Sequence, residues 1–151
     1  MQSLNALLQA TLYWVSPAAR AVLDALAECA GEFGSASFFA ARLSFRDRHQ
    51  LARVLAREAL PSLEELAAWV RTLSWLLQWE RSRTALCRLA IDAGVDPAAC
   101  YRTVKRLTGV NWNAVRARGL PWLLGQLVDR CRARDCTAPT RVDQSGELIS
   151  A

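Results

Sequence analysis

Two pairs of arginines, each spaced four residues apart, are the side chains in this sequence with the clearest potential for chemistry. The pairs are Arg53 with Arg57 and Arg102 with Arg106. On a helix, residues four apart lie on the same face, so each pair projects in one direction. A guanidinium can donate two parallel hydrogen bonds to guanine O6 and N7, or it can bind a phosphate. The spacing therefore indicates two helical surfaces that could contact nucleic acid.

The arginine pairs belong to an internal repeat. Ala40 matches Ala90 at an offset of 50 residues, and beyond a short turn the offset becomes 49. Each unit reads as a short helix, a tight turn and a longer helix opened by a capping aspartate, which is the layout of a helix-turn-helix. Arginines on one exposed helix are usually only solvated charge, but solvation requires no register shared by two helices. The positions matched at the offset of 49 are Asp47, Leu51, Arg53, Leu55 and Arg57 with Asp96, Cys100, Arg102, Val104 and Arg106.

Basic charge is concentrated in the same two segments. Residues 35–59 carry a net charge of +3 and residues 83–118 carry +5, whereas the rest of the chain sums to −3. Nucleic-acid-binding surfaces gather Lys and Arg in this way. If Leu51 and Val104 face the core, the helical step per residue turns both arginine pairs toward solvent.

The apolar periodicity predicts an all-α fold without strands. The longest helix is expected at 63–81, opened by the capping box of Ser62 and Glu65, and a short helix runs from Ser35 or Ser37 to about Leu43. The apolar stripe expected to face the core from the long helix is Leu66, Trp69, Val70, Leu73, Leu76 and Leu77. The other helices are expected at about 3–14, 17–31, 47–59, 84–93, 96–107, 112–118 and 122–133. We expect a single helical domain over 1–134 and a disordered tail over 135–151.

The segments around both turns resemble the DNA-binding module of AraC/XylS-type transcriptional regulators. The resemblance covers roughly residues 17–118, and its most specific part is the run Lys105-Arg106-Leu107-Thr108-Gly109-Val110. The sequence departs from the family where Ser44 replaces a turn glycine, where the second turn is one residue shorter, and where Cys100 and Val104 replace aromatics. The other matching runs are Ala40-Ala41-Arg42-Leu43-Ser44-Phe45, Leu51-Ala52-Arg53-Val54-Leu55, Leu89-Ala90-Ile91-Asp92-Ala93-Gly94-Val95 and Tyr101-Arg102-Thr103-Val104.

The resemblance implies tandem helix-turn-helix units at about 35–60 and 84–110, joined by the long helix and flanked by extra helices at both ends. It implies a sequence-specific transcriptional regulator that binds double-stranded DNA with recognition helices 47–59 and 96–107 in the major groove. Only about thirty residues precede the module, so we expect it to stand alone, without the family's usual sensor domain. Because Ala98 and Ala99 have no polar reach, we expect the first unit to read bases and the second mainly to bind phosphate. The residues expected to contact DNA are Arg46, Arg48, His49, Gln50, Arg53, Arg57, Ala98, Tyr101, Arg102, Lys105 and Arg106.

Two alternative functions stay open at the level of sequence. One is a protein-interaction module that uses the helix-turn-helix scaffold and its tryptophan-rich helices, since a fold does not fix a function. The other is non-specific, architectural DNA binding. The leucine-rich N-terminal helix, with Tyr13 and Trp14, is expected to be an apolar surface patch where a homodimer partner or a separate sensor protein could bind.

The composition argues against several other classes of protein. His49 is the only histidine, so no Cys–His or Ser–His catalytic set is expected and we predict that the protein is not an enzyme. Cys131 and Cys136 lack a second Cys/His pair, and we predict no metal and no cofactor, with reduced thiols. No apolar run reaches the roughly 18 residues of a membrane span, and no signal peptide is recognisable, so we expect a cytoplasmic protein without a membrane partner.

Overall fold

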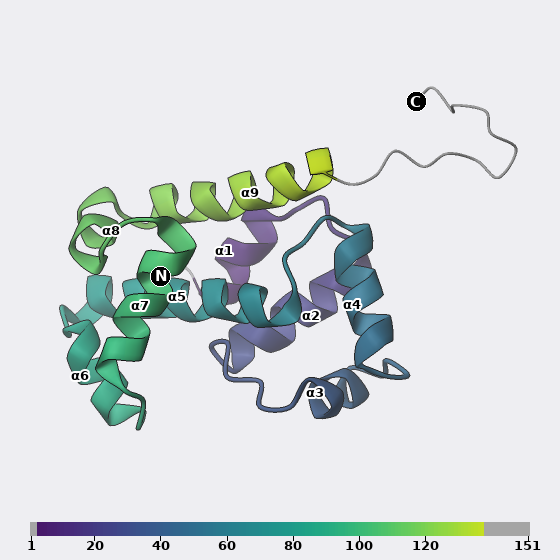
Figure 1. Cartoon of the computed structure of the whole chain (residues 1–151), viewed down its shortest axis with the longest axis horizontal. Coiled ribbons are helices and arrows are strands. Elements are labelled where there is room, and N and C mark those ends of the chain that lie inside the picture. Colours follow the sequence, from purple (N-terminus) through teal and green to yellow (C-terminus); the bar gives the residue numbers. More distant parts are fainter. Residues whose placement is uncertain (1–2, 138–151) are drawn as a thin grey trace, which may run out of the picture.

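The computed structural model describes residues 3–137, with side chains described for residues 3–136. Every regular element in this range is a helix, which confirms the all-α prediction (Figure 1). The helices are α1 (Leu4–Thr11), α2 (Pro17–Glu28), α3 (Ala36–Arg42), α4 (Arg48–Arg57), α5 (Leu63–Ser82), α6 (Leu86–Asp92), α7 (Pro97–Thr108), α8 (Trp112–Arg118) and α9 (Leu120–Thr137).

Side-chain caps explain why most helix starts could be predicted. Ser16 precedes Pro17 and its hydroxyl accepts from the backbone N–H of Ala19, and a proline is tolerated at the first helical position because that N–H has no helical partner. The hydroxyl of Ser62 likewise caps α5. For α3, Ser35 and not Ser37 is the cap, since Ser35 accepts from the N–H three residues later.

Helix α5 forms the centre of the fold. It runs through the middle of the molecule in Figure 1 and contacts α1, α2, α6, α7 and α9. Its predicted apolar stripe is buried throughout, with Leu66, Val70, Leu73 and Leu76 fully inaccessible. One hydrophobic cluster draws residues from every described helix. Within it, α5 contacts both helices of the second unit, whereas α4 of the first unit packs on α2, which in turn contacts α5.

The predicted ends of several helices were wrong. Helix α2 stops at Glu28 instead of about residue 31, because Ala30 and Gly31 adopt the left-handed conformation. Gly31 also lies so close to the carbonyl oxygen of Ala67 on α5 that a Cβ would collide with it. The end of α2 is therefore set by packing onto α5.

Two further corrections concern the termini. Helix α1 ends at Thr11 instead of residue 14, and its leucines are core residues, because Leu8 and Leu12 are fully buried. Helix α9 begins at Leu120 with Pro121 in its first turn, where a proline is tolerated. It continues to Thr137, so the tail predicted from residue 135 starts too early, and residues 138–151 lie outside the described part of the chain.

Candidate nucleic-acid interface

The turns of the two repeated units have the same backbone geometry. Ser44 has φ 64° and Gly94 has φ 72°, and both are left-handed at the matching position. The residue that follows each of them donates its N–H back to the carbonyl of the short helix five residues earlier. These bonds run from Phe45 N to Ala40 O at 3.0 Å and from Val95 N to Ala90 O at 2.9 Å. The offset of 50 residues therefore holds in space, and Ser44 supports a conformation that normally favours glycine.

An aspartate opens the longer helix of each unit, as predicted. Asp47 accepts a hydrogen bond from the backbone N–H of Gln50 at 2.8 Å, and Asp96 accepts one from Ala98 at 3.1 Å. The hydrogen bond from Gln50 holds the pKa of the Asp47 carboxyl below its ordinary value, and the neighbouring Arg46 acts in the same direction. Asp96 is followed directly by Pro97, and the second turn is one residue shorter.

The inward and outward faces of α4 and α7 are those expected from the helical period. Leu51 and Leu55 are buried on α4, and Cys100 and Val104 are buried at the matching positions on α7. Burial raises the pKa of the Cys100 thiol, which therefore packs as a small apolar group. The predicted arginine pairs, Arg53 with Arg57 and Arg102 with Arg106, are all exposed.

The exposed basic side chains of α4 and α7 differ in whether they form a salt bridge. Within the described residues, Arg53, Arg57, Lys105 and Arg106 form no salt bridge. The Nη2 atom of Arg102 instead lies 3.7 Å from Oδ2 of Asp96, the cap of its own helix. This pair is largely exposed, so it is weak.

Other predicted contact residues lie on the flank of α4 or at its start. The side chain of Gln50 turns back, because its Oε1 accepts from the backbone N–H of Arg46 at 2.6 Å. Arg46 is exposed, with its Nε 3.6 Å from the Asp47 carboxylate. Arg48 and His49 line a hollow of about 440 Å³ between α4 and the start of α5. Arg46, Arg48 and Gln50 are thus grouped around the first turn of α4, whereas His49 precedes Arg53 by four residues and continues the arginine face.

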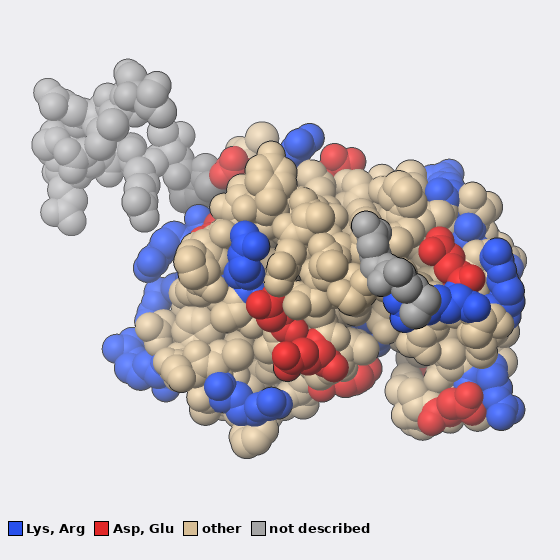
Figure 2. Space-filling view, turned by 180° about the vertical axis from the view of Figure 1, so that it is seen from behind, with Lys and Arg blue, Asp and Glu red and all other residues tan. Residues whose placement is uncertain are grey.

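On the second unit, Tyr101 and Ala98 are exposed on α7, as expected. Figure 1 shows α4 and α7 at opposite ends of α5, both crossing its direction. On the reverse face in Figure 2, Lys and Arg gather at the two lateral edges, and a group of Asp and Glu lies between them. Because Figure 2 is turned by 180°, its left edge corresponds to the right side of Figure 1, where α4 lies. Basic charge therefore accumulates at both ends of the molecule.

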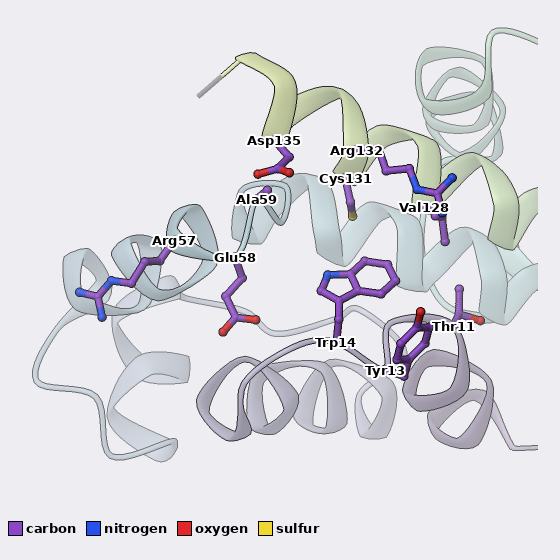
Figure 3. Close-up of a pocket in the computed structure, with 10 residues that line it drawn as sticks. All are labelled: Thr11, Tyr13, Trp14, Arg57, Glu58, Ala59, Val128, Cys131, Arg132 and Asp135. Atoms are coloured by element: carbon purple, nitrogen blue, oxygen red, sulfur yellow. The ribbon is translucent and has the colours of Figure 1, made fainter. Parts of the chain in front are cut away.

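A second surface feature lies where α1, α4 and α9 meet. A hollow of about 490 Å³ is lined there by Tyr13 and Trp14, whose rings meet edge to face with centroids 5.5 Å apart. Figure 3 shows Trp14 projecting toward Cys131 of α9, while Arg57 points away from the hollow. Burial raises the pKa of the Cys131 thiol to about 11, so this thiol is protonated near neutral pH.

Two searches within the described residues bear on other kinds of site. No three His, Cys, Asp or Glu side chains in residues 3–136 lie together in a way that could hold a metal ion. None of the helices described in residues 3–137 has both the length and the apolar character of a membrane span.

Comparisons of the chain with protein-family models, with curated proteins and with solved structures gave no match.

Proposed function

We propose that the protein is a transcriptional regulator that binds double-stranded DNA sequence-specifically, with α4 and α7 as its two recognition helices. The observation that supports this proposal is the shared register of the two units: in each, the helix after the turn begins at a capping aspartate and carries an outward arginine pair at matching positions. Solvation of charge would not require the shared register. We further propose that this activity is cytoplasmic, as in the regulators that the chain resembles.

The electrostatic difference between the units supports a division of labour. Arg53 has no ion pair within the described residues, so its guanidinium is available to bind a base edge with two hydrogen bonds. Arg102 is held near Asp96, and Ala98 on the same face has no polar atom to offer a base. The first unit is therefore assigned to base reading and the second mainly to phosphate binding.

Binding measurements on three variants test this division. Arg53→Ala should cost about 1–3 kcal/mol at one base pair, whereas Lys105→Ala should weaken all sequences to a similar degree. The matched control is Arg88→Ala on α6, because Arg88 is already paired with Asp92 at 3.2 Å. Affinity for a selected duplex and for its single-base variants would be measured at one fixed salt concentration. Equal losses on every duplex for both variants would instead indicate non-specific, architectural binding.

The exposed aromatic pair favours a second candidate function, a protein-interaction module. Tyr13 is 73% exposed and Trp14 is 43% exposed beside the hollow at α9. Exposed aromatics next to a hollow are typical of sites that bind a protein partner. A homodimer or a separate sensor protein would then contact this end of α1. Sedimentation of the wild type and of Tyr13→Ala/Trp14→Ala over a range of concentrations would reveal the homodimer as an association that the double variant loses.

A further inference from the structure

Two guanidiniums share one tryptophan ring at the end of α5. The Cζ atom of Arg83 lies 4.3 Å from the centroid of the Trp79 ring, and the Cζ atom of Arg116 lies 5.2 Å from the same centroid. Next to them along the chain, Arg118 lies over Trp122 of α9, with its Cζ 4.8 Å from the ring centroid. The end of α5 and helix α8 thus place two arginines on one indole, and a third arginine of α8 lies over the indole at the start of α9. We call these three the arginine cluster.

Within residues 3–136, the arginine cluster takes part in no salt bridge. Arg83 and Arg118 form no salt bridge there, and the side-chain partner of Arg116 is the neutral amide oxygen of Asn113. The Nε of Arg116 is buried without any hydrogen-bond partner. Each guanidinium has five N–H donors, and a cation over an indole face leaves those donors free for an acceptor. Because Arg83 and Arg116 contact the same ring, an anion bound beside that ring would be attracted by both charges.

Arg83 is one of four non-glycine residues with a positive φ in the described part of the chain, with Ala30, Ser44 and Ala59. Arg83 ends α5 in the left-handed conformation, with φ 56°, and donates its N–H to Trp79 O at 2.7 Å. Glycine is the residue that adopts this conformation without strain, so the arginine side chain is present at a conformational cost.

The arginine cluster lies beside the second repeated unit. Helix α8 follows α7 directly and contacts it. Figure 2 shows Lys and Arg gathered along its right-hand edge, which after the 180° turn corresponds to the left side of Figure 1, where α8 and the end of α5 lie. A long polyanion bound at α7 could therefore extend across this edge.

From these observations we propose that Arg83, Arg116 and Arg118 form a phosphate-binding site for the DNA backbone that flanks the base pairs facing α7. This inference rests on the proposed function and adds a contact outside both recognition helices. Guanidiniums bind phosphate with two parallel, charge-assisted hydrogen bonds, and each such contact releases counterions from the DNA. The site fixes the position of the protein on the duplex without reading its sequence.

The experiment uses variants that remove charge without loosening the fold. Arg83→Gly removes the guanidinium and also relieves the left-handed strain, so reduced DNA binding cannot be ascribed to unfolding. It is combined with Arg118→Ala, while Arg116 is kept because it joins α8 to Trp79. Arg83→Lys/Arg118→Lys retains the charge, and Arg88→Ala is the matched loss of an already paired arginine.

Duplex affinity is measured over a series of salt concentrations. The Arg83→Gly/Arg118→Ala variant should lower the slope of log K against log salt by about 0.9 for each lost contact, and the lysine variant should restore most of it. Arg88→Ala should leave the slope unchanged. Titration with duplex should also change tryptophan emission, and Trp79→Phe should reduce that change, leaving the part that comes from Trp122 beneath Arg118.

The outcomes separate this site from the proposed function. Specific binding with the same salt slope in the double variant and in Arg88→Ala would overturn the site while leaving the proposed function intact. If the wild type bound duplex without sequence preference, and the double variant had the reduced salt slope, the site would be supported and sequence-specific regulation would be overturned. Polyglutamate is the probe for an acidic protein partner. If it changed the emission of Trp79 more strongly than duplex of equal charge does, the assignment of the arginine cluster to DNA phosphate would be overturned.

Discussion

Ser44 introduces backbone strain into the first repeated turn that the second turn avoids. It adopts the left-handed conformation that glycine adopts at the matching position 94. Non-glycine residues carry roughly 1 kcal/mol of strain there, so we expect Ser44→Gly to raise the free energy of unfolding by about 0.5–1 kcal/mol. Urea denaturation of both proteins measures the change.

The reciprocal substitution is the control for this prediction. A Cβ on Gly94 would meet nothing within 4 Å, so Gly94→Ser reports backbone strain without a clash. It should lower the free energy of unfolding by about 1 kcal/mol. If neither substitution changed stability, the left-handed turn assigned to both units would be wrong.

The Asp47 cap should make α4 sensitive to acid. Because its folded pKa lies below the ordinary value of 3.8, the carboxylate contributes stability that is fully present above pH 3.8 and is lost as pH falls through the lowered pKa. Asp47→Asn keeps an oxygen that can cap the helix but does not titrate. The stability advantage of the wild type over Asp47→Asn should therefore shrink below pH 3.8. Urea unfolding from pH 5 to pH 3 checks this, and a difference that stayed constant with pH would contradict it.

At the scale of elements, the predictions succeeded where caps and apolar periods are local. Helices α4, α5 and α7 begin at capping residues Asp47, Ser62 and Asp96, and their buried stripes follow the helical period. The end of α2 could not be predicted, because it depends on the approach of Gly31 to Ala67, 36 positions along the chain. Sequence periodicity carries no information on such a contact.

Glu58 joins two elements that the sequence pattern leaves unconnected. Both of its carboxylate oxygens accept from the backbone N–H of Ser16, at 3.0 and 2.8 Å, so the end of α4 is fixed to the start of α2. Hydrogen bonds to a charged acceptor contribute about 1.5–3 kcal/mol. We expect Glu58→Ala to destabilise the fold by about 1–2 kcal/mol and also to weaken DNA binding by releasing α4.

A matched control separates this effect from a general loss of negative charge. Glu80 is exposed on α5 and has no hydrogen bond or salt bridge within the described residues. Glu80→Ala should change stability by less than about 0.5 kcal/mol. Thermal denaturation of both variants makes the comparison. An equal loss of stability in both would show that the hydrogen bonds between Ser16 and Glu58 do not stabilise the fold.

At the scale of the whole molecule, the sequence predicted the recurring arginine face but not everything around it. The exposure of Arg53 and Arg102 follows from the helical period. The side chain of Gln50 folds back because it accepts one hydrogen bond from the backbone N–H of Arg46. The sequence pattern does not predict this hydrogen bond. The arginine cluster was missed because its members come from the end of α5 and from α8, and only packing brings them onto shared tryptophan rings.

The role of the leucine-rich start of the chain could not be predicted from the sequence either. Its amphipathic pattern is equally compatible with a surface patch and with a core helix. The fold uses it as a core helix, burying Leu8 and Leu12 against α2 and α5, so that Tyr13 and Trp14 are what remains exposed. Which face a helix buries is decided by the elements available to cover it.

Selection from a randomised duplex library, at fixed near-physiological salt, tests the central claim most directly. We expect enrichment of a site with two short motifs centred about 10 base pairs apart, as two recognition helices in successive turns of the major groove require. Arg53→Ala should relax selection at one position of one motif. A library that stays unenriched, with binding that is absent or disappears uniformly as salt increases, would contradict sequence-specific recognition by α4 and α7.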